Sequence, residues 1–131
     1  MALQGVAMRK QSSRCVLCIG SDLVNLNLRC ARLKSYGWEA VSCGSGHEGV
    51  FRFAQGDIDL VILDLNGDGS ESALIAGELK RQRPSVRIIM LIANKETLVP
   101  DATALADAVV LKSEEERTLA HCVNQLLLRS V

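Results

Sequence analysis

Short runs of apolar residues, several of which stop at an aspartate, a glycine or a lysine, recur along the chain and restrict the folds open to it. The clearest is Leu60–Leu63, which lies between Asp59 and Asp64. A continuous apolar run of this length is typical of a strand that is buried on both faces, as in a parallel sheet. Apolar runs and their flanking residues predict strands at 15–19, 38–43, 59–64, 86–92 and 108–111.

Segments with helical spacing separate the predicted strands. In residues 22–35, apolar side chains recur at steps of three and four with basic ones on the polar positions between them: Leu23, Leu26, Cys30 and Leu33 against Arg29, Arg32 and Lys34. Serines offer N-caps for three further helices, namely Ser45 with Glu48 in a capping box, Ser70 or Ser72, and Ser113 with Glu116 in a second box. A remaining helical segment falls within 95–106, where Pro100 interrupts it.

Five strands that alternate with five helical segments predict a doubly wound α/β fold. Right-handed crossovers then give a five-stranded parallel sheet covered by helices on both faces, with the strand order 2-1-3-4-5. In such sheets, ligands bind at the carboxyl ends of the strands, near the point where the strand order reverses. The residues that follow each apolar run are therefore the candidates for a functional site.

Composition narrows the class of protein. The 131 residues suit one domain, which we place at 14–131 after a flexible segment at 1–13. Fifteen basic residues balance fifteen acidic ones, which gives no indication of a nucleic-acid or membrane-surface partner. An odd count of five cysteines favours reduced thiols, and no signal peptide or membrane span is apparent, so a cytoplasmic location is expected.

An acid and a lysine stand at the ends of two predicted strands. Asp64 ends the run Leu60–Leu63, and Lys112 ends the run at 108–111. If they face each other, the carboxylate can act as a nucleophile that forms an acyl phosphate, and the ammonium can balance phosphoryl charge. A simple exposed ion pair is the alternative that these two residues alone leave open.

The order of these motifs resembles that of a response-regulator receiver domain. The resemblance is carried by Asp59–Asp64, Ile88–Ala93 and Val109–Lys112, and it covers residues 14 to about 129. It implies the flavodoxin-like (βα)5 arrangement. It also implies that Asp64 is the phosphoacceptor for a histidine kinase in a two-component phosphorelay, and that Lys112 contacts the phosphoryl group.

Several positions depart from the family pattern. Receivers usually carry two adjacent acidic residues after the first strand, where this chain has Gly20 and Ser21. The hydroxyl residue that receivers carry after the fourth strand is replaced by Ile92, and Ser113 stands where a proline usually follows the lysine. Without that hydroxyl, phosphorylation loses its usual means of drawing the loop inward.

The same departures deplete a magnesium site. Mg²⁺ requires hard oxygen ligands in near-octahedral geometry, and only Asp64, the Asn66 carbonyl and Asp22 remain to provide them. The segment Asp64–Gly69 also matches the start of a calcium loop. Its twelfth position is Ile75 where such a loop needs a glutamate, so a polar turn is the better interpretation.

Three classes of function follow. The first is a phosphoacceptor that uses Asp64 and Lys112. The second is a pseudo-receiver that binds a protein regardless of phosphorylation, through the face built by the fourth and fifth helical segments. The third is a small metal- or ligand-binding α/β domain. The expected partners are a histidine kinase, another signalling protein or a second copy of the chain. Beyond self-phosphorylation of Asp64, no enzymatic activity is expected.

Overall fold

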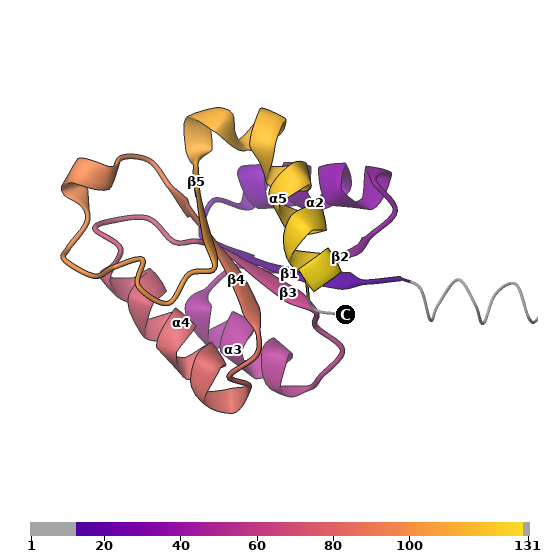
Figure 1. Cartoon of the computed structure of the whole chain (residues 1–131), viewed down its shortest axis with the longest axis horizontal. Helices are drawn as coiled ribbons and strands as arrows, with labels where there is room; N and C mark the ends of the chain where they lie inside the picture. The colour runs from indigo at the N-terminus through magenta and orange to yellow at the C-terminus, as the bar shows by residue number, and fades with distance from the viewer. Residues whose placement is uncertain (1–12, 130–131) are drawn as a thin grey trace, which may run out of the picture.

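The computed structural model describes residues 13–129, and these form one five-stranded parallel sheet between two helical layers (Figure 1). The strand order β2-β1-β3-β4-β5 confirms the predicted topology. The strands are β1 (Cys15–Gly20), β2 (Glu39–Cys43), β3 (Leu60–Asp64), β4 (Arg87–Ile92) and β5 (Ala108–Leu111). Of the predicted flexible segment 1–13, residues 1–12 lie outside the described residues, as do 130 and 131 of the predicted domain.

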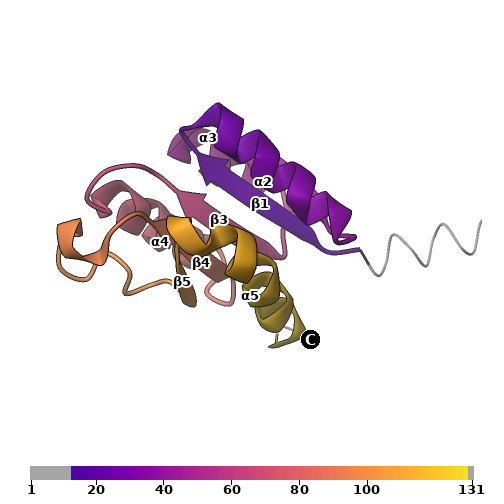
Figure 2. The ribbon, with the colours of Figure 1, turned by 90° about the horizontal axis from the view of Figure 1, so that it is seen from above.

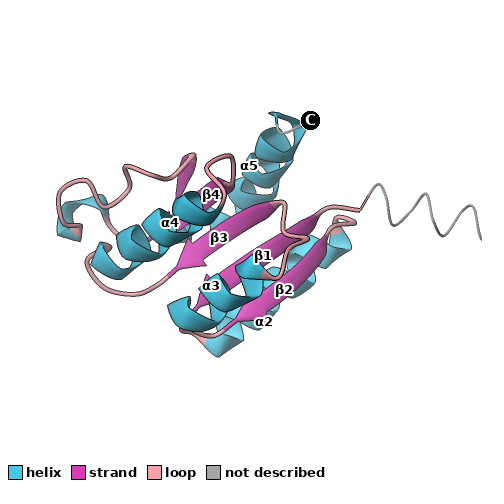
Figure 3. Cartoon of the chain, turned by 90° about the horizontal axis from the view of Figure 1, so that it is seen from below, coloured by secondary structure: helices cyan, strands magenta, loops and turns pink. Residues whose placement is uncertain are grey.

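Two helices cover each face of the sheet. The helices α2 (Leu23–Ser35) and α5 (Glu115–Arg129) lie on one face, and α3 (Gly46–Ala54) and α4 (Ser70–Gln82) lie on the other (Figures 2 and 3). Each helical layer encloses its own apolar cluster against the sheet. Alternate residues of the central strands belong to the two different clusters, because successive side chains of a strand point to opposite faces.

The cysteines of β1 follow the same alternation. Cys18 belongs to the cluster under α2 and α5, whereas Cys15 packs against the cluster under α3 and α4. The two thiols therefore point to opposite faces and cannot act as a chelating pair.

Local capping fixes where the helices begin. Ser45 accepts a hydrogen bond from the Glu48 amide at 3.2 Å, which confirms Ser45 as the predicted N-cap. The prediction of a serine cap for α4 was wrong, since Gly69 occupies the cap position with φ +86° and Asp68 accepts from the Ser70 amide. The last helix begins at Glu115 after a 3₁₀ turn over Lys112–Glu114, two residues beyond the predicted cap at Ser113.

The segment between β4 and β5 differs most from expectation. The predicted helical segment at 95–106 is a single 3₁₀ turn, η1 (Lys95–Thr97), followed by turns that lead into β5. Pro100 lacks the N–H that a helix interior needs. The Val99 amide instead donates to the Asp68 carbonyl at 2.8 Å, which ties the segment to the loop before α4.

Close packing also holds this segment against α4. A Cβ atom added at Gly69 would lie 2.7 Å from the Cβ of Ala102, so only glycine lets the two loops approach this closely. The fourth and fifth helical segments, predicted to form a binding face, are therefore η1 with its turns and α5.

Candidate functional site

The carboxyl ends of β1, β3, β4 and β5 meet at one edge of the sheet. Gly20, the last residue of β1, pairs with Asp64, the last residue of β3. The next residue after β5 is Lys112, whose Nζ lies 2.7 Å from Oδ1 of Asp64 and 3.1 Å from Oδ1 of Asn66. The strand-end positions thus bring the predicted acid and lysine together, in line with the rule for open α/β sheets.

Arg29 is the site residue that the sequence argument missed. Its position was predicted to be on the polar face of the first helix, and this was wrong, because the side chain is only 2% exposed. Nη2 of Arg29 donates to Oδ2 of Asp64 at 2.9 Å. Its spacing of three after Leu26 and four before Leu33, both buried, is the signal that would have placed it on the core face.

A glutamate on α5 holds the other side of the Arg29 guanidinium. Nε of Arg29 donates to Oε2 of Glu115 at 2.6 Å, and Nη2 donates to Oε1 at 3.1 Å. This paired geometry matches the planar fork of arginine to a carboxylate. Arg29, Asp64, Lys112 and Glu115 thus form one group of two positive and two negative side chains, which we call the Asp64 network.

Opposing effects act on the Arg29 guanidinium. Burial by itself lowers the pKa of Arg29, but the hydrogen bonds and negative charges of Glu115 and Asp64 outweigh it, so the net pKa is raised. The side chain is therefore firmly cationic. Because a buried charge is costly unless it is paired and hydrogen-bonded, the two carboxylates are what allow Arg29 to lie inside the domain.

Of the other two predicted ligands, Asp22 is engaged elsewhere, whereas the Asn66 side chain lies beside Lys112. Asp22 is the N-cap of α2, where its carboxylate accepts from the amides of Val24 and Asn25 at 3.1 and 3.2 Å and from the Asn25 side chain. The Asn66 side chain bridges the strand ends, since its Nδ2 donates to the Ser21 hydroxyl at 3.1 Å.

These residues do not fit a magnesium ion. Oδ2 of Asp64 carries the Arg29 hydrogen bond, and Oδ1, which accepts no hydrogen bond among the described residues, is in ion-pair contact with the Lys112 ammonium. Across residues 13–129, no group of three or more His, Cys, Asp or Glu side chains is placed to hold a metal ion. A hard divalent cation prefers several oxygen ligands, whereas here the central carboxylate already faces two cations.

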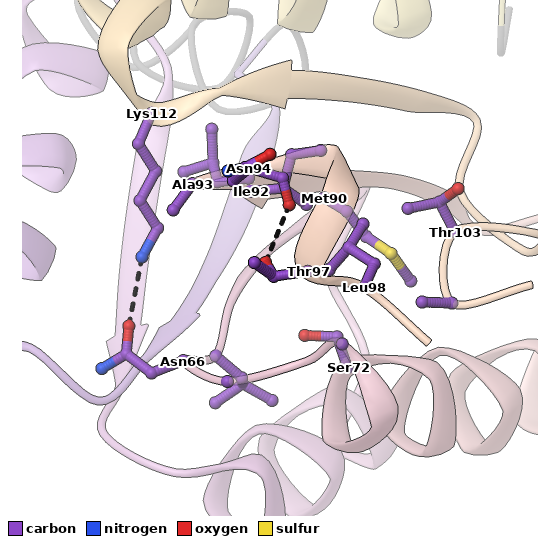
Figure 4. A pocket seen from close by; sticks show the side chains of 15 residues that line it. Asn66, Ser72, Met90, Ile92, Ala93, Asn94, Thr97, Leu98, Thr103 and Lys112 are labelled. Atoms are coloured by element: carbon purple, nitrogen blue, oxygen red, sulfur yellow. Dashed lines mark hydrogen bonds between the residues drawn. The ribbon is translucent and has the colours of Figure 1, made fainter. Parts of the chain in front are cut away.

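Ile92 ends β4 beside a small cavity and is almost fully buried. The cavity measures about 60 Å³, and its lining includes Ile92, Met90, Leu98 and Ser72 (Figure 4). Asn66 and Lys112 lie at one side of it, joined by their hydrogen bond. Ile92 therefore presents a hydrocarbon surface at the position where the family resemblance led us to look for a hydroxyl.

The calcium-loop match has no counterpart in the geometry. Asp68 lies outside the Asp64 network, where its Oδ1 accepts from the amide and the hydroxyl of Ser70 at 3.0 and 2.7 Å. These hydrogen bonds lower the pKa of the exposed Asp68 carboxyl. The segment is a polar turn that leads into α4, as predicted.

Comparisons with known proteins place the chain. No protein-family model matches it. The transcriptional regulatory protein GlrR of Escherichia coli (strain K12) is 33% identical over 89 residues, which is 68% of this chain and 20% of GlrR. The same values hold for the transcriptional regulatory protein QseF of Escherichia coli O157:H7, so the chain spans about a fifth of these curated relatives.

Solved structures match over most of the chain. The response regulator TrrA of Thermotoga maritima, in complex with Mg²⁺-BeF, has a TM-score of 0.78 at 27% identity, covering 86% of this chain and 98% of that one. TrrA in complex with the histidine kinase ThkA matches with a TM-score of 0.76 at 28% identity, covering 87% of this chain and 98% of that one. A receiver domain from Clostridium thermocellum has a TM-score of 0.79 at 21% identity over 89% and 96% of the two chains, which supports the fold alone.

Receiver domains are signalling domains rather than enzymes. This agrees with the prediction that the chain has no enzymatic activity beyond self-phosphorylation of Asp64. None of the helices within residues 13–129 is long and apolar enough to cross a membrane. The chain has the fold of the receiver domains of two-component response regulators, and its sequence is similar to that of response regulators.

Proposed function

We propose that this receiver domain is a cytoplasmic module that binds a signalling protein without requiring phosphorylation of Asp64. The observation that carries the proposal is Ile92, which is buried at the end of β4 and has no hydrogen-bonding group. A phosphoryl group on Asp64 would find no hydroxyl there to draw the following loop inward. The phosphoryl group would then interact about equally with the two states of that loop, so it would have little effect on their populations.

The proposed binding face consists of η1 with its turns, β5 and α5. A groove beside β5 is lined by residues of the β4–β5 segment, including Leu98, Val99 and Pro100, and by Val109 of β5. Leu105 and Val109 are exposed apolar side chains on this part of the molecule. Exposed apolar side chains favour contact with a protein rather than with nucleic acid, in keeping with the zero net charge.

A phosphoacceptor role is the second candidate, favoured by the 2.7 Å contact between Lys112 and Asp64. In that role a carboxylate oxygen of Asp64 attacks the phosphorus of a phosphohistidine, the P–N bond breaks, and an acyl phosphate forms. Lys112 would balance the charge of the transferred group. The complex of TrrA with its histidine kinase makes a kinase the matching class of partner for this candidate. A metal- or ligand-binding role outside signalling gains no support from the comparisons.

Intact-mass measurement separates the two candidates. The domain is incubated with acetyl phosphate or with phosphoramidate, whose P–N bond imitates phosphohistidine, in the presence of Mg²⁺, beside an Asp64→Asn control. We expect no mass gain that depends on Asp64. A gain of one phosphoryl group that disappears in the control would establish Asp64 as the acceptor. It would refute the proposal if the amide signals of the segment between β4 and β5 also shifted on phosphorylation.

A further inference from the structure

We propose that Arg29 takes the place of a divalent metal at Asp64, so that the carboxylate is neutralised by the chain's own side chains and the position is closed to cations. This inference deepens the proposed function and rests on it. The Arg29 side chain is 2% exposed and Asp64 is 5% exposed, so the pair lies inside the domain. Arg29 is thus an internal, permanent cation at the residue that a magnesium ion would otherwise approach.

The hydrogen bonds of Arg29 show that its position is built rather than incidental. Its Nε and Nη2 reach both oxygens of Glu115, and Nη2 also reaches Asp64. These contacts join α2, β3 and the first turn of α5. Asp64 and Glu115 lie 35 and 86 residues after Arg29 in the sequence. A guanidinium held by two carboxylates in this way cannot leave without depriving both of a hydrogen-bonded partner.

The local charge balance opposes a metal ion. The Asp64 network contains two cations and two anions, so an added divalent ion would bring a net charge of plus two beside the buried side chains of Arg29 and Asp64. It would also have to displace Lys112 from Oδ1 or Arg29 from Oδ2. Gly20 and Ser21 contribute no carboxylate to offset these costs.

Removing Arg29 should allow a divalent cation to bind at Asp64. In Arg29→Met, Asp64 and Glu115 would face the same space without the group that now bridges them, and their like charges would repel. Two carboxylates with a gap between them are suited to a hard divalent cation. We therefore expect the variant to be less stable than the wild type and to recover part of that loss when Mn²⁺ or Mg²⁺ is added.

Thermal unfolding in EDTA and in millimolar Mn²⁺ or Mg²⁺ tests this expectation. An ion present at ten times its Kd, and bound only by the folded state, raises Tm by roughly 5 °C for a domain of this size. We expect such a rise in Arg29→Met and none in the wild type. Arg32→Met is the matched control, because Arg32 lies on the same helix, is 33% exposed and is 3.8 Å from Glu115. Arg29→Met combined with Asp64→Asn should lose the rise.

A second measurement does not depend on the variant being folded. Paramagnetic Mn²⁺ is titrated into the ¹⁵N-labelled wild type and Asp64→Asn, and broadening of the amide signals of residues 20–22 and 66 is followed. We expect no broadening that depends on Asp64. Asp64-dependent broadening in the wild type, or a folded Arg29→Met that gains nothing from either ion, would overturn the inference.

The outcomes also separate this inference from the proposed function. Phosphorylation of Asp64 in EDTA that shifts the amide signals of the segment between β4 and β5 would refute the proposed function and leave the role of Arg29 standing. Binding of Mn²⁺ at Asp64 in the wild type would refute the role of Arg29, whatever the mass measurement shows.

Discussion

Glu115→Gln isolates the contribution of one carboxylate to the Asp64 network. The substitution keeps the shape of the side chain but removes its charge, and an amide N–H₂ replaces one oxygen that accepts from Arg29. Arg29 would remain buried, with Asp64 as its remaining carboxylate partner in the network. Breaking a buried ion pair from one side typically costs about 3–5 kcal/mol.

The expected magnitude lies at or below the lower end of that range. Glu115 is 14% exposed and partly solvated, and Arg29 keeps its hydrogen bond to Asp64. We therefore expect the free energy of unfolding to fall by about 2–3 kcal/mol. With a urea m-value of about 1.5–2 kcal/mol/M, the unfolding midpoint should fall by roughly 1–2 M.

Glu116→Gln is the matched control, because it makes the same chemical change one residue away. Glu116 is 82% exposed and contacts Arg32 at 3.5 Å, so its loss should change the unfolding free energy by less than about 0.5 kcal/mol. The single tryptophan, Trp38, packs against the apolar cluster under α2 and α5, so its fluorescence follows unfolding. Equal urea midpoints for the two variants would refute the view that the network is a buried, coupled structure.

Four further substitutions test the fold and the site. Gly49→Ala should destabilise the domain by about 1–3 kcal/mol, since the new Cβ would lie 2.2 Å from Cδ1 of Ile19. Gly77→Ala is the control, because its new Cβ would have only a 3.8 Å contact, and it should raise Tm slightly. A lower Tm for Gly77→Ala would contradict this reasoning. Asp22→Ala should lower the free energy of unfolding in urea by about 1 kcal/mol, because the α2 cap is lost, and the decrease should be the same in EDTA and in Mg²⁺. A decrease seen only in Mg²⁺ would instead identify Asp22 as a metal ligand. Lys112→Met should lower the free energy of unfolding by less than Glu115→Gln does, because Lys112 is 32% exposed. A larger fall in the urea midpoint for Lys112→Met than for Glu115→Gln would refute this order.

The sequence by itself determined the layers of the fold. Runs such as Leu60–Leu63 have no polar face, which is typical of strands covered on both sides, and parallel crossovers then bring Asp64 and Lys112 to the same edge of the sheet. The N-cap at Ser45 was predictable for a similar reason, because its hydrogen bond joins residues three apart. Such features depend on local patterns, which a single sequence displays directly.

Tertiary structure alone decided the partners of Arg29 and the course of the segment before β5. A basic residue on a helix is normally solvated, and only the placement of β3 and α5 brings two carboxylates within reach of this one. In the same way, the helical expectation for 95–106 failed because Val99 pairs with the Asp68 carbonyl and Ala102 packs on Gly69. Both outcomes depend on contacts between segments far apart in the chain, and helical periodicity carries no information about such contacts.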